Sequence, residues 1–242
     1  MKKILMAMAM ISAVAVSCSK SSDGPAKPSK MYLTLIKGDW DSTVMEYNTD
    51  MTIKRTASFM TMGPYLNWDA LYIYNNDKLS SLTFGTVKFD AMYDSAGNFS
   101  FNDAKNVFDN QHRIIEARIY IGSDKMYAGL NKYTWDSMNL TRIDCYDKDG
   151  KLFFIKNYKY DNKINPQQDI PVGTKKWEDP ARYLSANNIT DEKAGNPTGG
   201  NSGSIFYKYK YNDRNYPVSA EVYAVDGVTS SRTDSLNFTY LP

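Results

Sequence analysis

The chain has little of the residues on which many catalytic sites depend. Its 242 residues include one histidine, His112, and two cysteines, Cys18 and Cys145. Nucleophilic catalysis by serine or cysteine usually requires a base beside the nucleophile, most often a histidine. His112 falls in the predicted turn 109–112, so we interpret it as an exposed turn residue. Cys145 alternates with Ile143 in a predicted strand, so we interpret it as a core residue.

Motifs for metals, cofactors and paired catalytic carboxylates are also lacking. The run 147–150 (DKDG) shares a fragment of the EF-hand loop, but that register places Cys145 at the first position and Lys156 at the twelfth, and neither suits calcium. A loose surface calcium site formed by several Asp-rich turns stays open. Many aspartates already have a turn role, so no pair stands out as a glycosidase site. We therefore expect no enzymatic activity, no metal and no cofactor.

An excess of charge and a long apolar run are absent as well. The formal net charge of +2 falls to zero when residues 1–17, which include Lys2 and Lys3, are removed. Lys and Arg are scattered among Asp and Glu, which argues against binding to nucleic acid. No stretch approaches the roughly 20 consecutive apolar residues that a membrane-spanning helix needs.

What the N-terminus does contain is a pattern for export. Lys2 and Lys3 precede the uncharged stretch 4–16, and Ser17 stands directly before Cys18. This pattern predicts a secretory signal peptide over residues 1–17. Residues 15–18 (AVSC) resemble the lipobox of bacterial lipoproteins, although Ala15 stands where leucine is usual. The resemblance implies that Cys18 is lipidated and becomes the new N-terminus.

The residues after Cys18 predict a tether followed by one domain. Residues 19–30 are polar, contain Pro25 and Pro28, and have no apolar face to bury. We expect a lipidated cysteine and flexible tether over 18–30 and a single β domain over 31–242. The expected location is the cell envelope, at the outer membrane, with the periplasmic and surface faces both open. Because Cys18 would carry lipid, Cys145 has no partner for an intrachain disulfide.

The domain is dominated by a repeated unit in which an aromatic residue is followed by Asp or Asn, a few turn-forming residues and a new alternating run. Asp or Asn side chains bond their own backbone to start turns, and aromatic residues favour strands. The pattern therefore predicts successive hairpins, of which 140–160 is the clearest. The eight units are Tyr47-Asn48, Tyr74-Asn75, Tyr93-Asp94, Phe108-Asp109, Trp135-Asp136, Tyr146-Asp147, Tyr160-Asp161 and Tyr211-Asn212.

These hairpins predict an all-β fold, an antiparallel meander curled into a barrel or half-barrel, with a two-layer β-sandwich as the alternative. The pattern lapses over 162–204, a proline-rich segment that we expect to be an irregular loop. Within it, 177–184 favours one short helix, with Asp179 as N-cap and Pro180 as first helical residue. Strand alternation returns at 206–211 and 221–224, and 236–241 is the expected last strand.

Units such as Tyr146-Asp-Lys-Asp-Gly-Lys-Leu152, Tyr160-Asp-Asn-Lys-Ile-Asn-Pro166 and the segment 209–217 support a resemblance to a known group. The chain resembles uncharacterised envelope lipoproteins of gut Bacteroidota that carry aromatic-Asp turn repeats and a domain of unknown function. It is more distantly similar to the YD repeats of Rhs-type proteins. The resemblance implies an envelope β protein of unknown activity and supplies no functional residues.

The aromatic residues outside the repeat are the candidate ligand contacts. Aromatic rings on a sheet can stack on sugars or line an apolar groove, and Trp40, Trp68 and Trp177 are least explained by strand pairing. The leading hypothesis is a non-enzymatic binding protein whose partner is a surface glycan or a protein. The alternatives are a periplasmic carrier of lipid or lipoprotein with a concave apolar face, and a structural or interaction module.

Overall fold

The computed structural model describes residues 30–60, 66–101, 104–121, 126–168, 170–171, 180–199, 203–226 and 229–241. This part of the chain forms an all-β domain of sixteen antiparallel strands with a single short helix, as the sequence predicted. The predicted signal peptide, Cys18 and Trp177 lie outside the described residues, as does the tether up to residue 29.

The strands follow one another along the chain with short connections. The first eight are β1 (Tyr32–Lys37), β2 (Asp41–Tyr47), β3 (Ile53–Met60), β4 (Leu66–Asn75), β5 (Lys78–Phe84), β6 (Val87–Tyr93), β7 (Phe99–Phe101) and β8 (Ala104–Phe108). The others are β9 (Ile114–Ile121), β10 (Met126–Asp136), β11 (Asn139–Asp147), β12 (Leu152–Ile164), β13 (Asn187–Gly195), β14 (Gly203–Tyr211), β15 (Pro217–Asp226) and β16 (Thr229–Leu241). Helix α1 (Ala181–Leu184) lies between β12 and β13.

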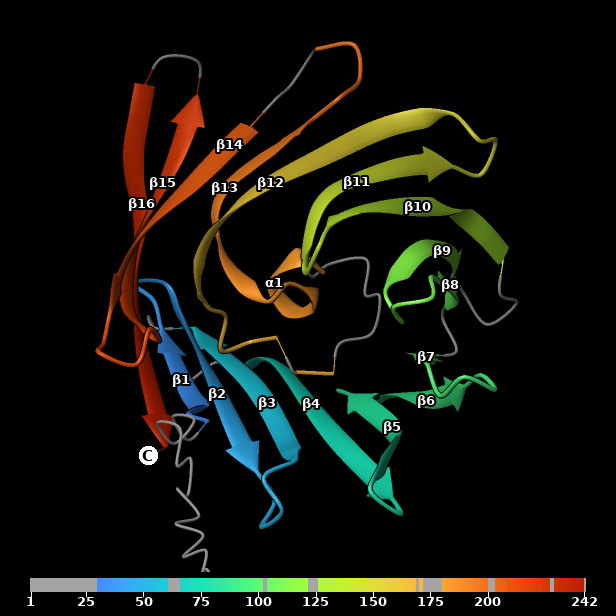
Figure 1. The fold of residues 1–242 in the computed structure, drawn as a ribbon, viewed down its shortest axis with the longest axis horizontal. Coiled ribbons are helices and arrows are strands. Elements are labelled where there is room, and N and C mark those ends of the chain that lie inside the picture. The colour runs from blue at the N-terminus through green and yellow to red at the C-terminus, as the bar shows by residue number, and fades with distance from the viewer. Residues whose placement is uncertain are drawn as a thin grey trace, which may run out of the picture.

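The sheet is a meander that curls into a nearly closed barrel (Figure 1). Each strand pairs with its neighbour along the chain, except at β7 and β8, which are the two edges of the sheet. The first and last strands pair with each other, with Leu33 opposite Tyr240 and Ile36 opposite Phe238. The barrel prediction is therefore confirmed, and the sandwich alternative is not what the chain forms.

The aromatic-Asp units, with the exception of Tyr160-Asp161, form the turns that their sequence predicted. Asp109 Oδ1 accepts the backbone N–H groups of Gln111 (2.9 Å) and Arg113 (3.0 Å), and the Asp109 N–H donates to the Arg113 carbonyl. His112 has a φ of 62° in this turn and is exposed, as expected. The same bonding pattern begins at Asp94, Asp147 and Asn212.

These units gather at one end of the barrel, because successive strands run in opposite directions and alternate connections share an end. All of them except Tyr146-Asp147 lie at the end where the chain enters β1 and leaves β16, which we name the turn end. The opposite end, which we name the rim end, carries the β1–β2, β3–β4 and β15–β16 connections.

The Tyr160-Asp161 turn prediction is wrong. Strand β12 continues through both residues to Ile164. The Asp161 carboxylate accepts the Lys163 N–H (2.9 Å), the Asn188 N–H (3.2 Å) and a hydrogen bond from the Tyr211 hydroxyl. Asp161 therefore lies within a continuous strand, where its carboxylate is bonded by Lys163 of β12 itself and by the neighbouring strands β13 and β14.

The segment 162–204 is more regular than expected, because it contains β13, which pairs with both β12 and β14. The β13 sequence (NNITDEKAG) has little apolar alternation, so sequence patterning did not reveal it. The predicted helix is present over Ala181–Leu184, but Pro180 is its N-cap and not its first residue as predicted. Residues 177–179 of the predicted range, which include the predicted N-cap Asp179, lie outside the described residues. The last strand is longer than predicted and begins at Thr229.

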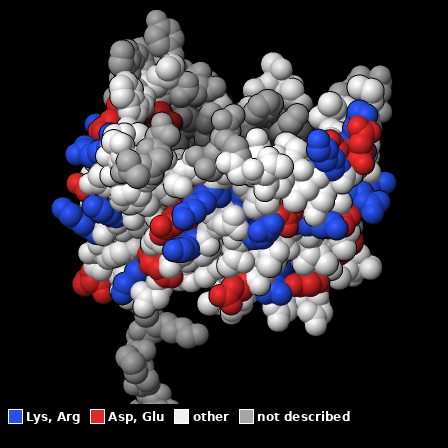
Figure 2. Space-filling model, turned by 90° about the horizontal axis from the view of Figure 1, so that it is seen from above, with Lys and Arg blue, Asp and Glu red and all other residues white. Residues whose placement is uncertain are grey.

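The barrel has two apolar clusters inside and ion pairs among its outer side chains. The two buried clusters in the interior lie around Leu33, Met45, Tyr72, Leu82 and Phe101, and around Tyr133, Leu140, Ile143, Tyr158 and Tyr207. On the outer face Arg55 donates to Glu46 (2.9 Å) and Asp69 (2.8 Å), and Arg142 donates to Asp144 (2.6 Å). Figure 2 shows acidic and basic side chains interspersed over the surface seen from above.

The connection between β12 and β13 folds back into the barrel, where α1 lies inside the curve of the sheet (Figure 1). We name its described part, residues 165–168, 170–171 and 180–186, the plug. The buried Ser185 hydroxyl accepts the Leu140 N–H (3.0 Å) and donates to the Tyr160 hydroxyl (2.9 Å). The buried Asn165 amide donates to the carbonyls of Arg182 (2.7 Å) and Ser185 (2.8 Å). These bonds fix the plug to itself and to the wall.

Candidate functional site: a cavity inside the barrel

The plug divides the interior into two cavities that share Ile170 and Tyr183 as a common wall. Cavity A, of about 620 Å³, lies between the plug and strands β1 to β4 and β13 to β16. Cavity B, of about 600 Å³, lies between the plug and strands β7 to β10. Both volumes fall in the range of small-molecule sites.

Aromatic side chains line one part of cavity A. Trp40 lies at the rim, 64% exposed, and its indole N–H donates to the Thr233 carbonyl (3.0 Å). That bond fixes the ring against the wall while leaving its face accessible. Trp68 lies deeper and packs against Phe84, with ring centroids 6.0 Å apart at an interplanar angle of 24°. Tyr72 continues the aromatic lining.

The structure thus brings together two of the three tryptophans that sequence reasoning singled out. Trp40 and Trp68 line the same cavity, although they belong to the β1–β2 connection and to β4. Cys145 packs against the second core cluster, and burial raises the pKa of its thiol to about 11, so the thiolate is scarce at neutral pH. His112 lines cavity B, with its Nδ1 2.6 Å from Asn98 Oδ1.

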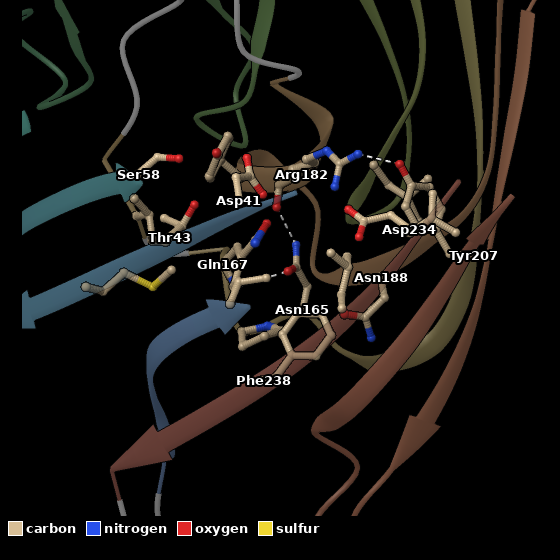
Figure 3. Close-up of a pocket in the computed structure, with 18 of the residues that line it drawn as sticks. Asp41, Thr43, Ser58, Asn165, Gln167, Arg182, Asn188, Tyr207, Asp234 and Phe238 are labelled. Carbon is tan, nitrogen blue, oxygen red and sulfur yellow. Dashed lines mark hydrogen bonds between the residues drawn. The ribbon is translucent and has the colours of Figure 1, made fainter. Parts of the chain in front are cut away.

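Polar side chains line the rest of cavity A, and several have no hydrogen-bond partner in the described part of the chain. Ser58 is 1% exposed and its hydroxyl has no such partner. The side chains of Asp41, Thr43 and Gln167 are likewise unpartnered among the described residues. Figure 3 shows these four residues around the cavity. Buried polar groups in proteins nearly always have partners, so an arrangement of this kind leaves bonding capacity for water or a ligand.

Of the residues that the structure describes, three charged ones line cavity A. Asp41 and Asp234 are close enough for Asp234 to raise the pKa of Asp41, although burial is the larger cause of that rise. Asp234 Oδ1 accepts the N–H groups of Asp39 (2.7 Å) and Ser235 (2.7 Å). The third is Arg182, whose guanidinium lies over the Tyr207 ring, 5.2 Å from its centroid, and donates to the Tyr207 hydroxyl (Figure 3).

Sequence reasoning missed these polar residues because no local motif joins them. Asp41 begins β2, Ser58 lies in β3, Arg182 in α1 and Asp234 in β16. Only pairing of the first and last strands brings Asp234 beside the β1–β2 connection. No spacing in the sequence could have indicated this set.

Among the described residues, no group of three or more His, Cys, Asp or Glu side chains is arranged to hold a metal ion. Within the same residues, no helix has the length and apolar character needed to cross a membrane.

Comparison with known proteins shows likeness in fold alone. No family model matches the chain, and no curated protein matches it. A porin-like protein from Bacteroides uniformis superposes with a TM-score of 0.54 at 12% identity, covering 87% of this chain and 95% of that chain. A second porin-like protein, from Bacteroides vulgatus, covers 87% of this chain and 99% of its own at 13% identity, with a TM-score of 0.46.

Proposed function

We propose that this protein is a lipid-anchored envelope protein, held at the outer membrane, that binds a glycan in cavity A without acting as an enzyme. The observation that carries the proposal is the combination in one cavity of Trp40 and Trp68 with unpartnered polar side chains such as Ser58 and Gln167.

The chemistry of a sugar matches this lining. A sugar ring has apolar C–H faces that stack on aromatic rings and hydroxyl groups that both donate and accept hydrogen bonds. An acyl chain would leave the buried Ser58 hydroxyl and its polar neighbours desolvated without partners, at a cost of about 1–3 kcal/mol for each such group. The mixed lining therefore favours a glycan over the lipid carrier that the sequence also left open.

The distribution of charge supports a barrel that lies in water. A barrel embedded in a membrane carries an apolar band outside and polar residues inside. This barrel has ion pairs such as Arg55–Asp69 and Arg142–Asp144 on its outer strand faces and apolar clusters inside. The likeness to a porin-like protein is accordingly used for the barrel fold alone, and we do not propose a pore.

The anchor follows from the sequence and fits the position of the first strand. Cys18 would hold the chain through its lipid, and a tether of residues 18–30 spans at most about 40 Å. Strand β1 begins at the turn end, so the tether leads to that end. The Trp40 rim of cavity A would then face away from the membrane.

The binding proposal is tested with the purified full-length mature protein in detergent. An oligosaccharide array identifies a ligand, and isothermal titration then compares wild type with Trp40→Ala and with Phe153→Ala. Phe153 is a matched control, since it is a 50% exposed aromatic residue that does not line cavity A. We expect Trp40→Ala to weaken binding at least tenfold and Phe153→Ala to leave it unchanged. Equal affinities in both variants, or no bound oligosaccharide, would contradict the proposal.

The anchor is tested separately in cells. Wild type should incorporate labelled fatty acid and fractionate with membranes, whereas Cys18→Ala should lose the label. Protease treatment of intact and lysed cells then assigns the face, because cleavage before lysis places the domain at the surface. A wild-type protein without fatty acid label would show that the anchor assignment is wrong.

A further inference from the structure

Cavity A contains an acidic pair without a cation. Asp41 and Asp234 both line it and repel each other, and within the described residues neither carboxylate forms an ion pair. Elsewhere on the barrel some acidic side chains do have a cationic partner, as Asp69 has Arg55 and Asp144 has Arg142. Asp41 and Asp234 therefore share the cavity without a cationic side chain paired to either of them among the described residues.

Among the described residues, the one cationic side chain that lines the same cavity is engaged with a neighbouring tyrosine. The Arg182 guanidinium stacks on Tyr207 and donates to its hydroxyl, and it forms no ion pair with Asp41 or Asp234. With two carboxylates against one guanidinium, the lining favours a ligand that brings a positive charge. Repulsion between like charges would disfavour an anionic ligand at this place.

Two further observations point to a ligand in the cavity that this acidic pair lines. Ser58 is 1% exposed, and its hydroxyl lines the same cavity without a partner in the described part of the chain. The Trp40 ring, next to Asp41 in the chain, is fixed at the rim by its bond to Thr233. An indole face attracts cations, and carboxylates bind ammonium groups by charge-assisted hydrogen bonds.

We infer that Asp41, Asp234 and Trp40 form a subsite for a protonated amine, so that the ligand of cavity A is a glycan containing an unacetylated amino sugar. This inference rests on the proposed glycan-binding function and specifies its ligand. The carboxylates would accept hydrogen bonds from the ammonium group, while Ser58 and Gln167 would bond the sugar hydroxyls.

The test is isothermal titration of the full-length mature protein with two oligosaccharides of equal length, one of glucosamine and one of N-acetylglucosamine. We expect the glucosamine oligomer to bind at least tenfold more tightly. Asp41→Asn should abolish that preference, since it removes charge and keeps shape. Asp39→Asn is the matched control, because Asp39 neighbours the site but pairs with Arg232 (3.5 Å) and does not line the cavity.

The outcomes separate this inference from the function on which it rests. Equal binding of the two oligomers, or an Asp41→Asn variant with unchanged preference, would overturn the amine subsite and leave glycan binding intact. Binding of a neutral oligosaccharide alone would do the same. Putrescine is a further probe: if it binds as tightly as the glucosamine oligomer and Asp41→Asn abolishes its binding, the amino-sugar assignment fails. Failure of every oligosaccharide would remove both proposals.

Discussion

Two buried serines show how the contact between plug and barrel wall differs from the wall of cavity A. Ser185, at the plug, and Ser58, in β3, are 0% and 1% exposed. The Ser185 hydroxyl accepts one hydrogen bond and donates another, both to the barrel wall. The Ser58 hydroxyl has no partner among the described residues and lines a cavity. The fold thus satisfies the Ser185 hydroxyl, whereas the unpartnered Ser58 hydroxyl faces a cavity, and several such polar groups at one place indicate a binding site.

Aspartates at the two ends of the barrel differ in the same way. At the turn end, hydrogen bonds from the Asn98 side chain and from backbone N–H groups lower the pKa of Asp94. At the rim end, burial and the charge of Asp234 raise the pKa of Asp41. The surroundings of Asp94 stabilise its charged form and so support the turn, whereas those of Asp41 disfavour its charged form unless a cation binds.

The largest expected effect separates the two serines. Ser185→Ala leaves the Leu140 N–H and the Tyr160 hydroxyl without their partner, so we expect a loss of about 1–3 kcal/mol in the free energy of unfolding. Ser58→Ala removes no internal bond, so its free energy of unfolding should stay within about 0.5 kcal/mol of wild type. Urea denaturation followed by circular dichroism measures both, and equal losses would remove the distinction between the two regions.

The next effect concerns the turn end. Asn212 Oδ1 accepts the N–H groups of Arg214 (3.0 Å) and Tyr216 (3.0 Å), so Asn212→Ala should destabilise the protein by about 1 kcal/mol. The exposed neighbour Asp213 is the control, and Asp213→Ala should change stability by less than about 0.5 kcal/mol. Neither substitution should alter glycan affinity in the titration assay. A loss of affinity in Asn212→Ala would mean that the turn end contributes to binding.

Acid should reduce the contribution of the turn end to the stability of the protein. The pKa of Asp94 is lower in the folded than in the unfolded chain, so its stabilisation is present above the unfolded pKa and is lost as pH falls through the folded pKa. We therefore expect Asp94→Asn to show a smaller fall in the urea midpoint than wild type between neutral pH and about pH 3. Parallel midpoint curves for the two proteins would show that Asp94 does not contribute to acid sensitivity.

The smallest expected effect is a gain in stability when the charge of Asp41 is removed. The pKa of Asp41 is raised on folding, so its charge disfavours the folded state above the folded pKa, and the penalty disappears below the unfolded pKa. Asp41→Asn should slightly raise the urea midpoint at neutral pH, and the difference should vanish in acid. A lower midpoint at neutral pH would show that the Asp41 carboxylate stabilises the fold, contrary to its assignment as a ligand group.

The features that the sequence could predict are those fixed by interactions between residues close together in the chain. The turn at Asp109 is fixed by side-chain bonds within five residues, so the hairpins and the barrel followed from short segments. Strand β13 escaped prediction because its pairing with β12 and β14, and not its apolar pattern, holds it in the sheet. Trp40 and Trp68 could be selected as unexplained aromatics, but their meeting in one cavity depends on the curvature of the whole barrel.

The central claim is that cavity A is a ligand site, and a crystal structure of the full-length mature protein with the best-binding oligosaccharide tests it most directly. The account predicts a sugar ring against Trp40 or Trp68 and hydroxyl groups within hydrogen-bond distance of Ser58 and Gln167. An oligosaccharide bound outside the barrel, with only water in cavity A, would contradict it.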